Sequence, residues 1–452
     1  MTDLTLMPHQ ERAADFLAQR GFAGLWDDPG LGKTASTVRG ADRAGARKIL
    51  VICPGVVKVH WSLEFLRWQQ IERPVTVVEG FLKAPPGDGV TIISHACVAD
   101  VPPPPGRKPR AGVGNSFAAI AAGAVYDAIV IDEAHEFRDY NAVRSRNLFS
   151  PGLLWSWSRH VWTLTGTPLV NSAADLWLLA YGPLRSTMPW WDWCQRFCEM
   201  KPDPYEGQKP TSIKDADGLA EFLRPHVLRR TLESVGIGLP ALEIQHRSVA
   251  LQQDAMQAVM ADLEGWTPQR LLHAMEEKDD FRDAAIARVR RALGIAKAYP
   301  TAVHVHQILS ASGGPVVVFF HHSDVRKMLF DMLRDQCGFR VSWIDGSVSA
   351  KQLKAATEWF QAGRLDVLLV QTQAGGTGIT LTRANRVVVA ELPWTAVALW
   401  QAVKRVHRIG QTRPCLAEPL RAADCWLEDA LASVVGKKHK AAEELLSRLI
   451  TA

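Results

Sequence analysis

Short runs of continuous apolar residues recur along the first third of this chain, and each run ends in small or polar residues. Four of them are KILVICPG at 48–55, GVTIISHA at 89–96, YDAIVIDEAH at 126–135 and HVWTLTGTP at 160–168, with helix-like stretches between them. A strand that is apolar on both faces is typical of a parallel sheet covered by helices on both sides. The pattern therefore predicts an open α/β sheet, which binds ligands at the carboxyl ends of its strands.

The same pattern resumes at 315–392 with the runs PVVVFFHH, FRVSWIDG, LDVLLVQT and NRVVVAEL. Two similar α/β lobes are the natural interpretation. Residues 186–300 between them lack such runs and are predicted to be helical. The expected domains are a first lobe at 1–185, a helical insertion and inter-lobe bridge at 186–300, and a second lobe at 301–452.

Composition excludes several classes of protein. With 47% hydrophobic and 22% charged residues, the chain is neither disordered throughout nor collagen-like nor a coiled coil. No apolar run approaches the roughly 18 residues of a membrane span, and the start MTDLTLMPHQER does not resemble a signal peptide. Seven scattered cysteines form no CxxC, which agrees with a reducing compartment. We expect a cytoplasmic protein.

The strongest local motif is DDPGLGKTAST, which begins at Asp27. Gly30 and Gly32 would let backbone N–H groups approach phosphate oxygens at the start of a helix, whose dipole favours negative charge. Lys33 would reach the β- and γ-phosphates, and the Thr34 hydroxyl would ligate Mg²⁺. The motif predicts a phosphate-binding loop for ATP, although Asp27 stands where GxxxxGK[ST] has its first glycine.

A second motif, IVIDEAH at 129–135, delivers two carboxylates at the end of an apolar strand. Asp132 is placed to hold Mg²⁺ through water, and Glu133 to polarise the water that attacks the γ-phosphate. Alone, this string could be an ordinary strand end. Together with the phosphate-binding loop it predicts nucleotide hydrolysis.

The segment QAVKRVHRIGQ places Gln401, Arg405 and Arg408 at i, i+4 and i+7, which predicts one face of a helix. A solvated basic helix is the alternative. In a two-lobe ATPase the second lobe supplies an arginine that neutralises γ-phosphate charge, an effect of roughly 10³–10⁵ in rate. We expect Arg405 and Arg408 to have this catalytic role.

These motifs together resemble the Swi/Snf-type ATPases of helicase superfamily two, which are double-stranded-DNA translocases, and in particular their compact branch that includes the annealing helicases. The resemblance runs through nearly the whole chain: LMPHQERAADFL, the phosphate loop, ICPGVVKVHW, DEAH, LTGTPLVN, WIDGSVSAKQLKAATEWF, QTQAGGTGITLTRANRVVVAELPW and QAVKRVHRIGQT. It implies two RecA-like lobes, with ATP and Mg²⁺ as substrate and cofactor. Leu353 departs from the arginine that usually follows DGS in this family.

The resemblance also implies roles for individual residues. Gln10 would read adenine, and Thr165 and Thr167 would couple hydrolysis to lobe movement. The full set of expected ATP-binding residues is Gln10, Asp28, Gly30, Leu31, Gly32, Lys33, Thr34, Gly378 and Gln401. Thr34 and Asp132 would hold Mg²⁺, the latter partly through water.

Nucleic-acid contacts are less strongly indicated by the residues. Small or polar groups at predicted strand ends could meet phosphates, and they are Lys58, Ser94, His95, Gln373 and Thr382. Trp61 joins them through the resemblance of its motif. The net charge of +5 lies wholly in residues 301–452, where 18 basic residues face 13 acidic ones. Such a balance fits a polyanion partner and a scattered solvated surface equally well.

The expected function is an ATP-dependent motor that tracks on double-stranded or forked DNA as a monomer, in a bacterial or phage-infected cell. Two alternatives stay open at this point. One is a strand-separating DNA or RNA helicase on the same scaffold. The other is a nucleotide-gated DNA- or protein-binding module with little turnover. The sequence names no protein partner.

Overall fold

The computed structural model describes residues 4–100, 116–123, 125–139, 141–149, 158–168, 172–181, 188–203, 207–262, 280–312, 314–372, 379–393 and 395–450. The chain divides into two compact units, and each is described by itself. The first unit comprises Met1–Gly238 and Lys438–Ala452, and the second comprises Leu239–Lys437. The chain therefore passes twice between the units.

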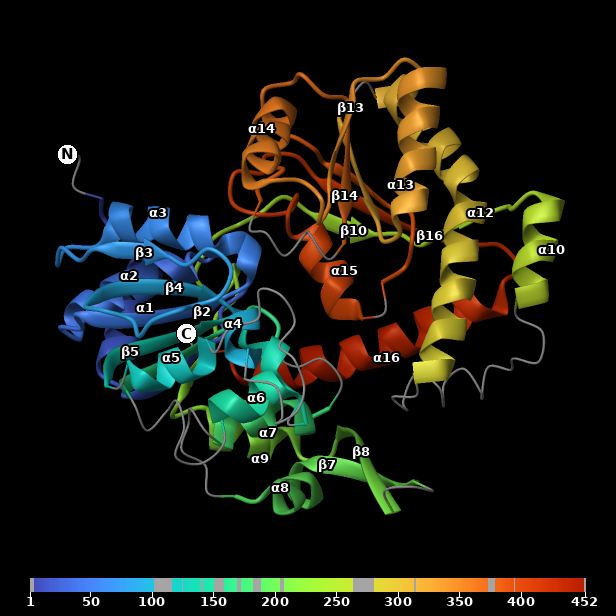
Figure 1. The fold of residues 1–452 in the computed structure, drawn as a ribbon. Coiled ribbons are helices and arrows are strands. Elements are labelled where there is room, and N and C mark those ends of the chain that lie inside the picture. Colours follow the sequence, from blue (N-terminus) through green and yellow to red (C-terminus); the bar gives the residue numbers. More distant parts are fainter. Residues whose placement is uncertain are drawn as a thin grey trace, which may run out of the picture. The chain divides into compact units, whose positions relative to one another are not determined.

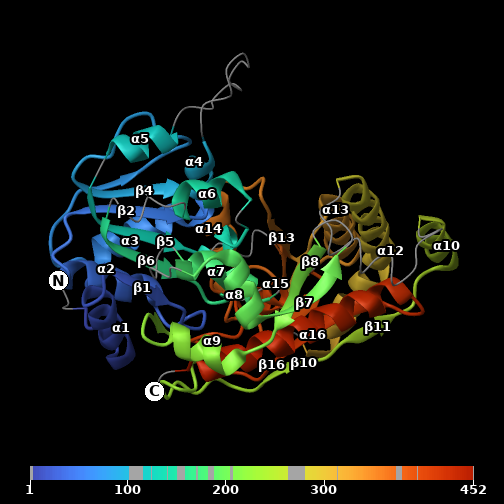
Figure 2. The ribbon, with the colours of Figure 1, turned by 90° about the horizontal axis from the view of Figure 1, so that it is seen from below.

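The first unit is built on a parallel sheet of seven strands in the order β3-β4-β2-β5-β6-β1-β9 (Figures 1 and 2). The strands are β1 (Phe22–Leu25), β2 (Lys48–Cys53), β3 (Val75–Val77), β4 (Gly89–Ser94), β5 (Tyr126–Asp132), β6 (Ser158–Leu164) and β9 (Val227–Leu228). Alternate residues of one strand enter different cores: Leu50 and Ile52 face one side of the sheet, and Ile49 and Val51 face the other. Burial on both faces explains the continuous apolar runs.

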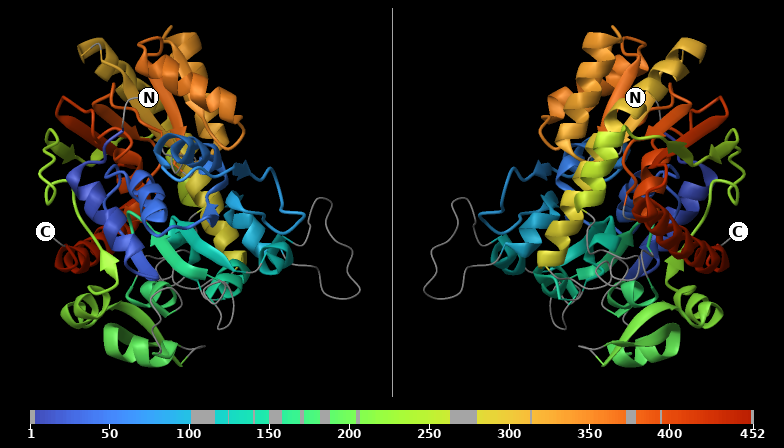
Figure 3. Two further views of the ribbon diagram at one scale, coloured as in Figure 1. Left: turned by 90° about the vertical axis from the view of Figure 1, so that its left-hand side faces the viewer. Right: turned by 90° about the vertical axis from the view of Figure 1, so that its right-hand side faces the viewer.

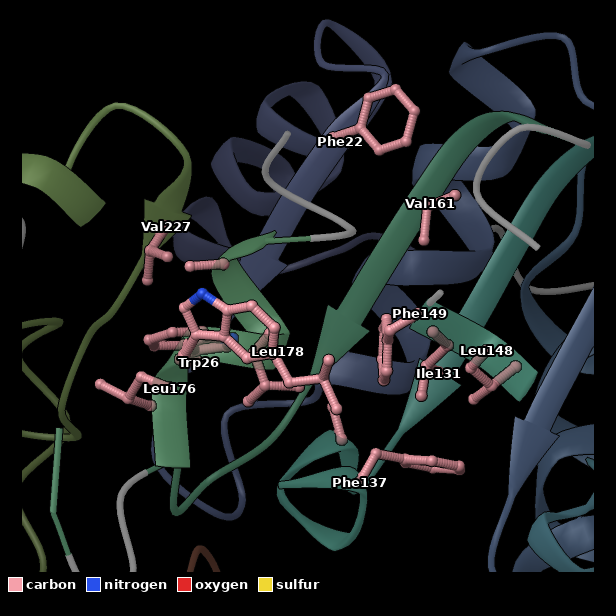
Figure 4. Packing of buried hydrophobic residues seen from close by; sticks show 14 of the residues in the cluster. Phe22, Trp26, Ile131, Phe137, Leu148, Phe149, Val161, Leu176, Leu178 and Val227 are labelled. Carbon is pink, nitrogen blue, oxygen red and sulfur yellow. The ribbon is translucent and has the colours of Figure 1, made fainter. Parts of the chain in front are cut away.

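Helices cover both faces of this sheet. One face is covered by α1 (Pro8–Ala18), α2 (Lys33–Arg43) and α3 (Lys58–Trp68). The other is covered by α4 (His95–Ala99), α5 (Ser116–Ala122), α6 (Val143–Phe149) and α7 (Ala174–Tyr181). Figure 4 shows part of this second core, where Phe137 and Phe149 lie beside Ile131 of β5.

The predicted helical insertion at 186–300 needs correction. Its first part contains α8 (Trp190–Phe197) and α9 (Ala216–Leu223), but between them lies an antiparallel hairpin of β7 (Cys198–Asp203) and β8 (Gly207–Ile213). Trp193 and Phe197 of α8 pack into the core of the first unit. Residues 239–300 belong instead to the second unit. The segment is thus shared between the units, and the boundaries at 185 and 300 stay predictions.

The second unit is also built on a parallel sheet, in the order β10-β16-β15-β12-β14-β13, with β11 paired to β16. The strands are β10 (Leu242–Ile244), β11 (Arg247–Val249), β12 (Val316–Phe320), β13 (Val341–Ile344), β14 (Val367–Gln371), β15 (Arg386–Val389) and β16 (Cys415–Ala422). The two parallel-sheet α/β lobes predicted from the sequence are confirmed.

Helices cover this second sheet on both sides as well. α14 (Ala350–Gln361) and α15 (Ala396–Val403) pack on one face. The long α12 (Asp280–Ser312) and α13 (Ser323–Phe330), which lie along each other in Figures 1 and 3, pack on the other. α10 (Gln253–Asp262) joins α12 and the start of α16 (Trp426–Arg448) in a smaller cluster.

Glu418 on β16 is a buried carboxylate at the centre of a charge cluster in the second unit. Its carboxylate pairs with Arg386 at 2.6 Å, with His304 at 3.2 Å and with Arg247 at 3.7 Å. Burial raises the pKa of Glu418, but the hydrogen bonds that His304 and Arg386 donate outweigh burial and bring this pKa to about 2. The ionised carboxylate is therefore the stable form in the folded unit.

Glu418→Gln is expected to lower the midpoint of thermal unfolding at pH 7 and to lower it less at about pH 3. Because the pKa of Glu418 is lower in the folded than in the unfolded chain, its charge stabilises the fold above about pH 4, and this contribution is lost as the pH falls toward 2. Thermal unfolding at pH 7 and at about pH 3 checks this. Glu243→Gln, at an exposed position on β10, is the control. An equal loss at both pH values would contradict the assignment.

Candidate functional site

The phosphate-binding loop predicted from GLGKT connects the end of β1 at Leu25 to the start of α2 at Lys33. Gly30 and Gly32 both adopt positive φ, at 96° and 76°. A Cβ on Gly32 would collide with the amide end of the Gln10 side chain, which would have to move. The loop therefore needs glycine for its backbone conformation, and it leads into a helix N-terminus whose N–H groups can bind phosphate oxygens.

Two side chains of α1 contact this loop. Nε2 of His9 lies 3.1 Å from the carbonyl oxygen of Leu31, and Nε2 of Gln10 donates to the same oxygen at 3.4 Å. Oε1 of Gln10 accepts a hydrogen bond from the backbone of Met7 at 3.0 Å. Gln10 is thus in place beside the loop, and its reading of adenine stays a prediction.

Lys33 at the start of α2 points back into the loop. Its Nζ donates to the carbonyl oxygens of Asp27 at 2.6 Å and of Asp28 at 3.2 Å. Burial lowers the pKa of Lys33, while the carboxylates of Glu133, Asp27, Asp132 and Asp28 oppose this shift, in that order. The ammonium is held among acidic groups on both sides, where phosphate oxygens can replace the carbonyl acceptors.

Asp132 at the end of β5 is fixed by three neighbours. Nε1 of Trp61 donates to Oδ2 of Asp132 at 2.8 Å, and the backbone N–H of Glu133 donates to Oδ1 at 2.9 Å. Nε2 of His95 lies 2.9 Å from the Asp132 carbonyl oxygen. Burial and the neighbouring Glu133 charge raise the pKa of Asp132 to about 6, against the Trp61 hydrogen bond, which lowers it.

Glu133 has a backbone conformation that non-glycine residues rarely adopt, with φ 49° and ψ 49°. This left-handed conformation costs of the order of 1–2 kcal/mol. In this conformation Oε2 of Glu133 lies 3.4 Å from Nδ1 of His135. Such strain at a strand end that carries a carboxylate is typical of a functional site.

Thr165 and Thr167 join the DEAH segment to the following motif. Nδ1 of His135 lies 3.0 Å from Oγ1 of Thr165, which also accepts a hydrogen bond from the backbone N–H of Thr167 at 3.1 Å. A Cβ on Gly166 between them would lie 2.9 Å from Cγ of Pro29 in the phosphate loop. Contacts therefore run from the carboxylates through this turn to the loop, while the coupling role of the threonines stays a prediction.

Trp61 and His95 are not positioned as nucleic-acid contacts, which corrects the sequence prediction. Trp61 is 1% exposed because α3 packs against the sheet, and its indole donor is directed at Asp132. His95 is buried against Phe137, with ring centroids 4.8 Å apart, and burial lowers its pKa to about 4. Both side chains contact Asp132 from within the first unit.

Trp61→Phe is expected to raise the Mg²⁺ concentration for half-maximal ATP hydrolysis by about tenfold, since it keeps the ring but removes the donor to Asp132. ATPase titrations with Mg²⁺, and Mn²⁺ binding to the ADP complex followed by spin resonance, check this. Trp68→Phe is the matched control on the same helix, where Nε1 donates to Glu64 at 3.0 Å. Equal metal dependence in the two variants would contradict the role of Trp61.

The other predicted nucleic-acid contacts are placed as follows. Lys58 begins α3, and its Nζ donates to the carbonyl of Val78 at 2.5 Å. Ser94 ends β4, with Oγ 3.5 Å from Sγ of Cys97. Gln361 donates to Oγ1 of Thr382 at 3.3 Å in the second unit. Their roles toward nucleic acid stay predictions. Gln373 and the ATP-binding candidate Gly378 lie outside the described residues.

The arginine motif of the second unit does not form the predicted continuous helix. α15 ends at Val403, so Gln401 lies on the helix while Arg405 and Arg408 lie in the turns that follow. Nη1 of Arg408 donates to the carbonyl of Ile379 at 3.1 Å, and burial lowers its pKa. The two arginines share a segment rather than a helix face.

Hydrogen bonds to other loops hold this segment in its turns. Nε2 of His407 lies 2.7 Å from the carbonyl oxygen of Pro240. Nε2 of Gln411 donates to the carbonyls of Ala384 at 2.7 Å and of Thr382 at 3.1 Å. Within the segment, the backbone keeps short-range hydrogen bonds, from the N–H of Arg405 to the carbonyl of Ala402 and from the N–H of Val406 to the carbonyl of Val403.

Two oxygen donors of the first unit fit the ligand chemistry of a Mg²⁺ that arrives with a nucleotide. Thr34 offers a hydroxyl in the first turn of α2, and Asp132 a carboxylate at the end of β5. Mg²⁺ sites of this kind use one or two carboxylates together with substrate phosphates. Among the described residues, no group of three or more His, Cys, Asp or Glu side chains could hold a metal alone. The donors that are present therefore suit a metal shared with phosphate.

Sequence reasoning missed Arg229 and Arg230, which contact the phosphate loop. Arg229 pairs with Asp28 at 2.9 Å, and Arg230 forms an ion pair with Asp27. Both arginines follow β9, whose two residues are too short for a periodic signal. The only local signal is a pair of consecutive basic residues after an apolar dipeptide.

Comparison with known proteins identifies the family. Residues 9–288 match the SNF2-related domain, and residues 301–410 match the helicase conserved C-terminal domain. The SWI/SNF-related matrix-associated actin-dependent regulator of chromatin subfamily A-like protein 1 of Xenopus tropicalis is 27% identical over 419 residues, which cover 90% of this chain and 41% of that protein.

Two further matches also extend over most of this chain. The DNA annealing helicase and endonuclease ZRANB3 of Mus musculus is 24% identical over 426 residues, which cover 90% of this chain and 37% of that protein. A solved SWI2/SNF2 ATPase core of Sulfolobus solfataricus in complex with dsDNA is 20% identical, with a TM-score of 0.43 and coverage of 99% of this chain and 97% of that chain. This chain spans about two fifths of the length of the curated relatives. Since the SNF2-related domain accounts for more than half of its residues, the chain belongs to the SNF2-related family.

Proposed function

We propose that this chain is an ATP-dependent DNA translocase, a helicase-like motor that hydrolyses ATP to track on double-stranded DNA. The observation that carries the proposal is the placement of one lysine and two carboxylates in the first unit, where the carboxylates oppose the lowering of the Lys33 pKa by burial. Lys33 begins the helix that follows the phosphate-binding loop, and its Nζ points back into that loop. Asp132 ends β5, which β6 separates from β1 in the sheet, and Glu133 follows it in a left-handed backbone conformation. The second support is membership of the SNF2-related family, whose relatives include a protein named as a DNA annealing helicase.

The residues of the first unit have distinct roles in this proposal. The loop N–H groups and Lys33 bind the β- and γ-phosphates, and Glu133 orients and polarises the attacking water. Thr34 and, through water, Asp132 hold Mg²⁺, which when bound neutralises charge on the phosphates. The other residues proposed to bind the nucleotide are Gln10, Asp28, Leu31, Gly378 and Gln401.

Arginines of the second unit complete the proposed reaction. Arg405 and Arg408 neutralise the charge that develops on the γ-phosphate, which ties hydrolysis to the meeting of the two units. Thr165 and Thr167 pass the change from the carboxylates to the rest of the first unit. Lys58, Ser94, Gln373 and Thr382 are the proposed contacts to the DNA backbone, with double-stranded or forked DNA as substrate and a monomer as the working form.

Location is proposed on narrower grounds. Among the described residues, no helix has both the length and the apolar character needed to cross a membrane. All seven cysteines are free thiols, six of them buried, as is typical of a reducing compartment. We place the motor in the cytoplasm of a bacterial or phage-infected cell.

The test is ATP hydrolysis measured at one stated salt concentration, since phosphate binding depends on salt, with single-stranded, duplex and forked DNA and with RNA. Duplex DNA is expected to stimulate the rate, and ATP is expected to drive displacement of a third strand from a triplex. Strand separation on DNA or RNA would favour the helicase alternative. A rate that neither duplex DNA nor Lys33→Ala changes would favour the binding module and overturn the motor.

A further inference from the structure

Arg229 and Arg230 lie where the edge strand β9 ends. β9 pairs in parallel with β1, with Gly24 opposite Val227 and Leu25 opposite Leu228. The residues after β9 therefore run alongside those after β1, which form the phosphate-binding loop. Backbone hydrogen bonds continue the pairing, from the N–H of Asp28 to the carbonyl of Arg230 at 2.9 Å.

Arg230 binds Asp27, the acidic residue with which the loop motif begins. Its guanidinium forms a two-point ion pair with Asp27, in which Nε donates to Oδ1 at 3.1 Å and Nη2 donates to Oδ2. Its remaining Nη1 donates to the carbonyl of His9 on α1. Arg230 and Asp27 are each 1% exposed, so the pair has no competition from water.

Arg229 binds Asp28, the next residue of the loop. Its Nη2 donates to Oδ1 of Asp28 at 2.9 Å, and its Nη1 donates to the carbonyl of Trp26 at 2.5 Å. Burial lowers the pKa of Arg229, with the carboxylates of Asp28 and Asp27 opposing the shift. A buried ion pair is weak support for stability, since apolar replacements are often as stable. Its presence here points to positioning.

The same two aspartates hold Lys33 from their other side. Nζ of Lys33 donates to the backbone carbonyls of Asp27 and Asp28, whose side chains are those that the arginines bind. Any displacement of the arginine pair therefore moves the two carbonyls that orient the phosphate-binding ammonium. Each arginine is thus linked to Lys33 through a single aspartate: Arg229 through Asp28, and Arg230 through Asp27.

Each of the two chain passages between the units is followed or preceded, within the first unit, by a segment that reaches these arginines. The first passage, at Gly238, follows Arg230 by only eight residues. The second passage occurs within α16, whose far end is fixed to the first unit by Arg448 and Asp217 at 2.7 Å, beside α9 in Figure 2. The chain then forms a parallel bridge between Ile450 and Arg229.

We propose that Arg229 and Arg230 are positioning residues that hold the phosphate-binding loop and transmit displacement of the chain passages between the units to Lys33. The inference rests on the proposed motor function. In this inference, movement between the units affects the nucleotide through Arg229, Arg230 and Lys33. This route does not include the carboxylates of DEAH or the arginines of the second unit.

The test is a double-mutant cycle of Arg229→Gln and Asp28→Asn. Arg230 is left unchanged, because its removal would strand Asp27 in the interior. Each single variant is expected to weaken binding of a fluorescent ADP analogue by about tenfold. Once Asp28 has been changed, Arg229→Gln is expected to add little further loss, because Arg229 acts on the nucleotide through Asp28. Binding is measured at a temperature where circular dichroism reports folded protein, so a loss of stability alone would not change it.

Two further variants sharpen the result. Arg229→Lys keeps the charge but provides a single point donor for two acceptors, and is expected to recover part of the binding. Arg224→Gln removes an exposed arginine five residues earlier and is expected to bind ADP as the unchanged chain does. In Arg229→Gln, the ratio of duplex-stimulated to basal ATP hydrolysis is expected to fall by about tenfold.

The outcomes separate the inference from the proposed function. Unchanged ADP affinity in Arg229→Gln would overturn the positioning role. Weaker ADP binding with an unchanged stimulation ratio would overturn transmission. If the unchanged chain itself shows no stimulation by duplex DNA, the proposed function is wrong and transmission falls with it, while the ADP cycle still decides whether the arginines position the loop.

Discussion

Glu133→Gln is expected to lower the rate of ATP hydrolysis at least about a thousandfold, which corresponds to roughly 4 kcal/mol of activation free energy. The amide matches the carboxylate in size but cannot accept a proton from the attacking water. Glutamine has backbone preferences similar to those of glutamate, so the left-handed conformation at φ 49° is no harder to adopt. Phosphate release under single-turnover conditions measures the chemical step directly.

ATP binding by the same variant is expected to change little. The phosphate loop and Lys33 are untouched, and the loss of one negative charge beside the phosphates favours binding if it has any effect. The variant should therefore accumulate with ATP bound, which a filter assay with labelled ATP would detect. A weaker affinity equal in size to the loss of rate would mean that Glu133 acts in binding rather than in hydrolysis.

Glu136→Gln is the matched control for this variant. Glu136 lies three residues later in the same turn, is 43% exposed at its side chain and pairs with Arg144 at 3.2 Å. A surface substitution of this kind is expected to change stability by no more than about 0.5 kcal/mol. If Glu136→Gln lowers the hydrolysis rate as much as Glu133→Gln does, the loss of rate comes from removing any negative charge in this turn and not from Glu133 in particular.

The central strands of both sheets could be predicted from the sequence because burial on both faces leaves a continuous apolar run. β2, β4 and β5 lie within the predicted runs, as do β12 and β14. The edge strands β3, β9 and β10 and the long β16 were missed, whereas the edge strand β13 lies within a predicted run. β16 has the sequence CLAEPLRA, in which Glu418 is buried through ion pairs rather than by apolar character. β9 has two residues and exists only because β1 lies beside it.

The site could be predicted where backbone geometry is local. Gly30 and Gly32 need positive φ whatever surrounds them, so GLGKT marks its own loop. Arg229 and Arg230 could not be found in this way, because their partners lie about two hundred residues earlier and no spacing rule connects them. Trp61 was assigned to nucleic acid because exposure cannot be read from a motif, and packing of α3 directs it at Asp132.

Spacing alone also failed for the second unit. Residues at i, i+4 and i+7 lie on one face only if the helix continues, and α15 ends at Val403. Val406 and Val403 are both fully buried, so the chain turns to keep the two in the core while His407 and Gln411 bind neighbouring loops. Periodicity over seven residues does not distinguish a helix from a helix end followed by turns.

Arg408→Ala is expected to lower duplex-stimulated ATP hydrolysis by about 10³-fold or more, as removal of an arginine that neutralises transition-state charge does in related chemistry. ADP affinity is expected to change little, because Arg408 belongs to the second unit and the loop that binds diphosphate to the first. Steady-state hydrolysis and ADP binding on the same preparation separate the two effects. Arg408→Lys is expected to stay defective, since lysine cannot reproduce the planar fork.

Comparison with two other arginines decides whether this loss reflects catalysis. Arg413→Ala, at an exposed position of the same segment, is expected to keep most of the rate. The double variant of Arg405 and Arg408 is expected to be little worse than the more defective single one if both arginines act on one phosphate, because groups that act as a unit are not additive. If the losses in the two single variants multiply in the double variant, the two arginines have separate roles. If Arg413→Ala loses as much activity as Arg408→Ala, the substitutions act by disturbing the conformation of the turns after α15. Nη1 of Arg408 would then serve only to hold the carbonyl of Ile379.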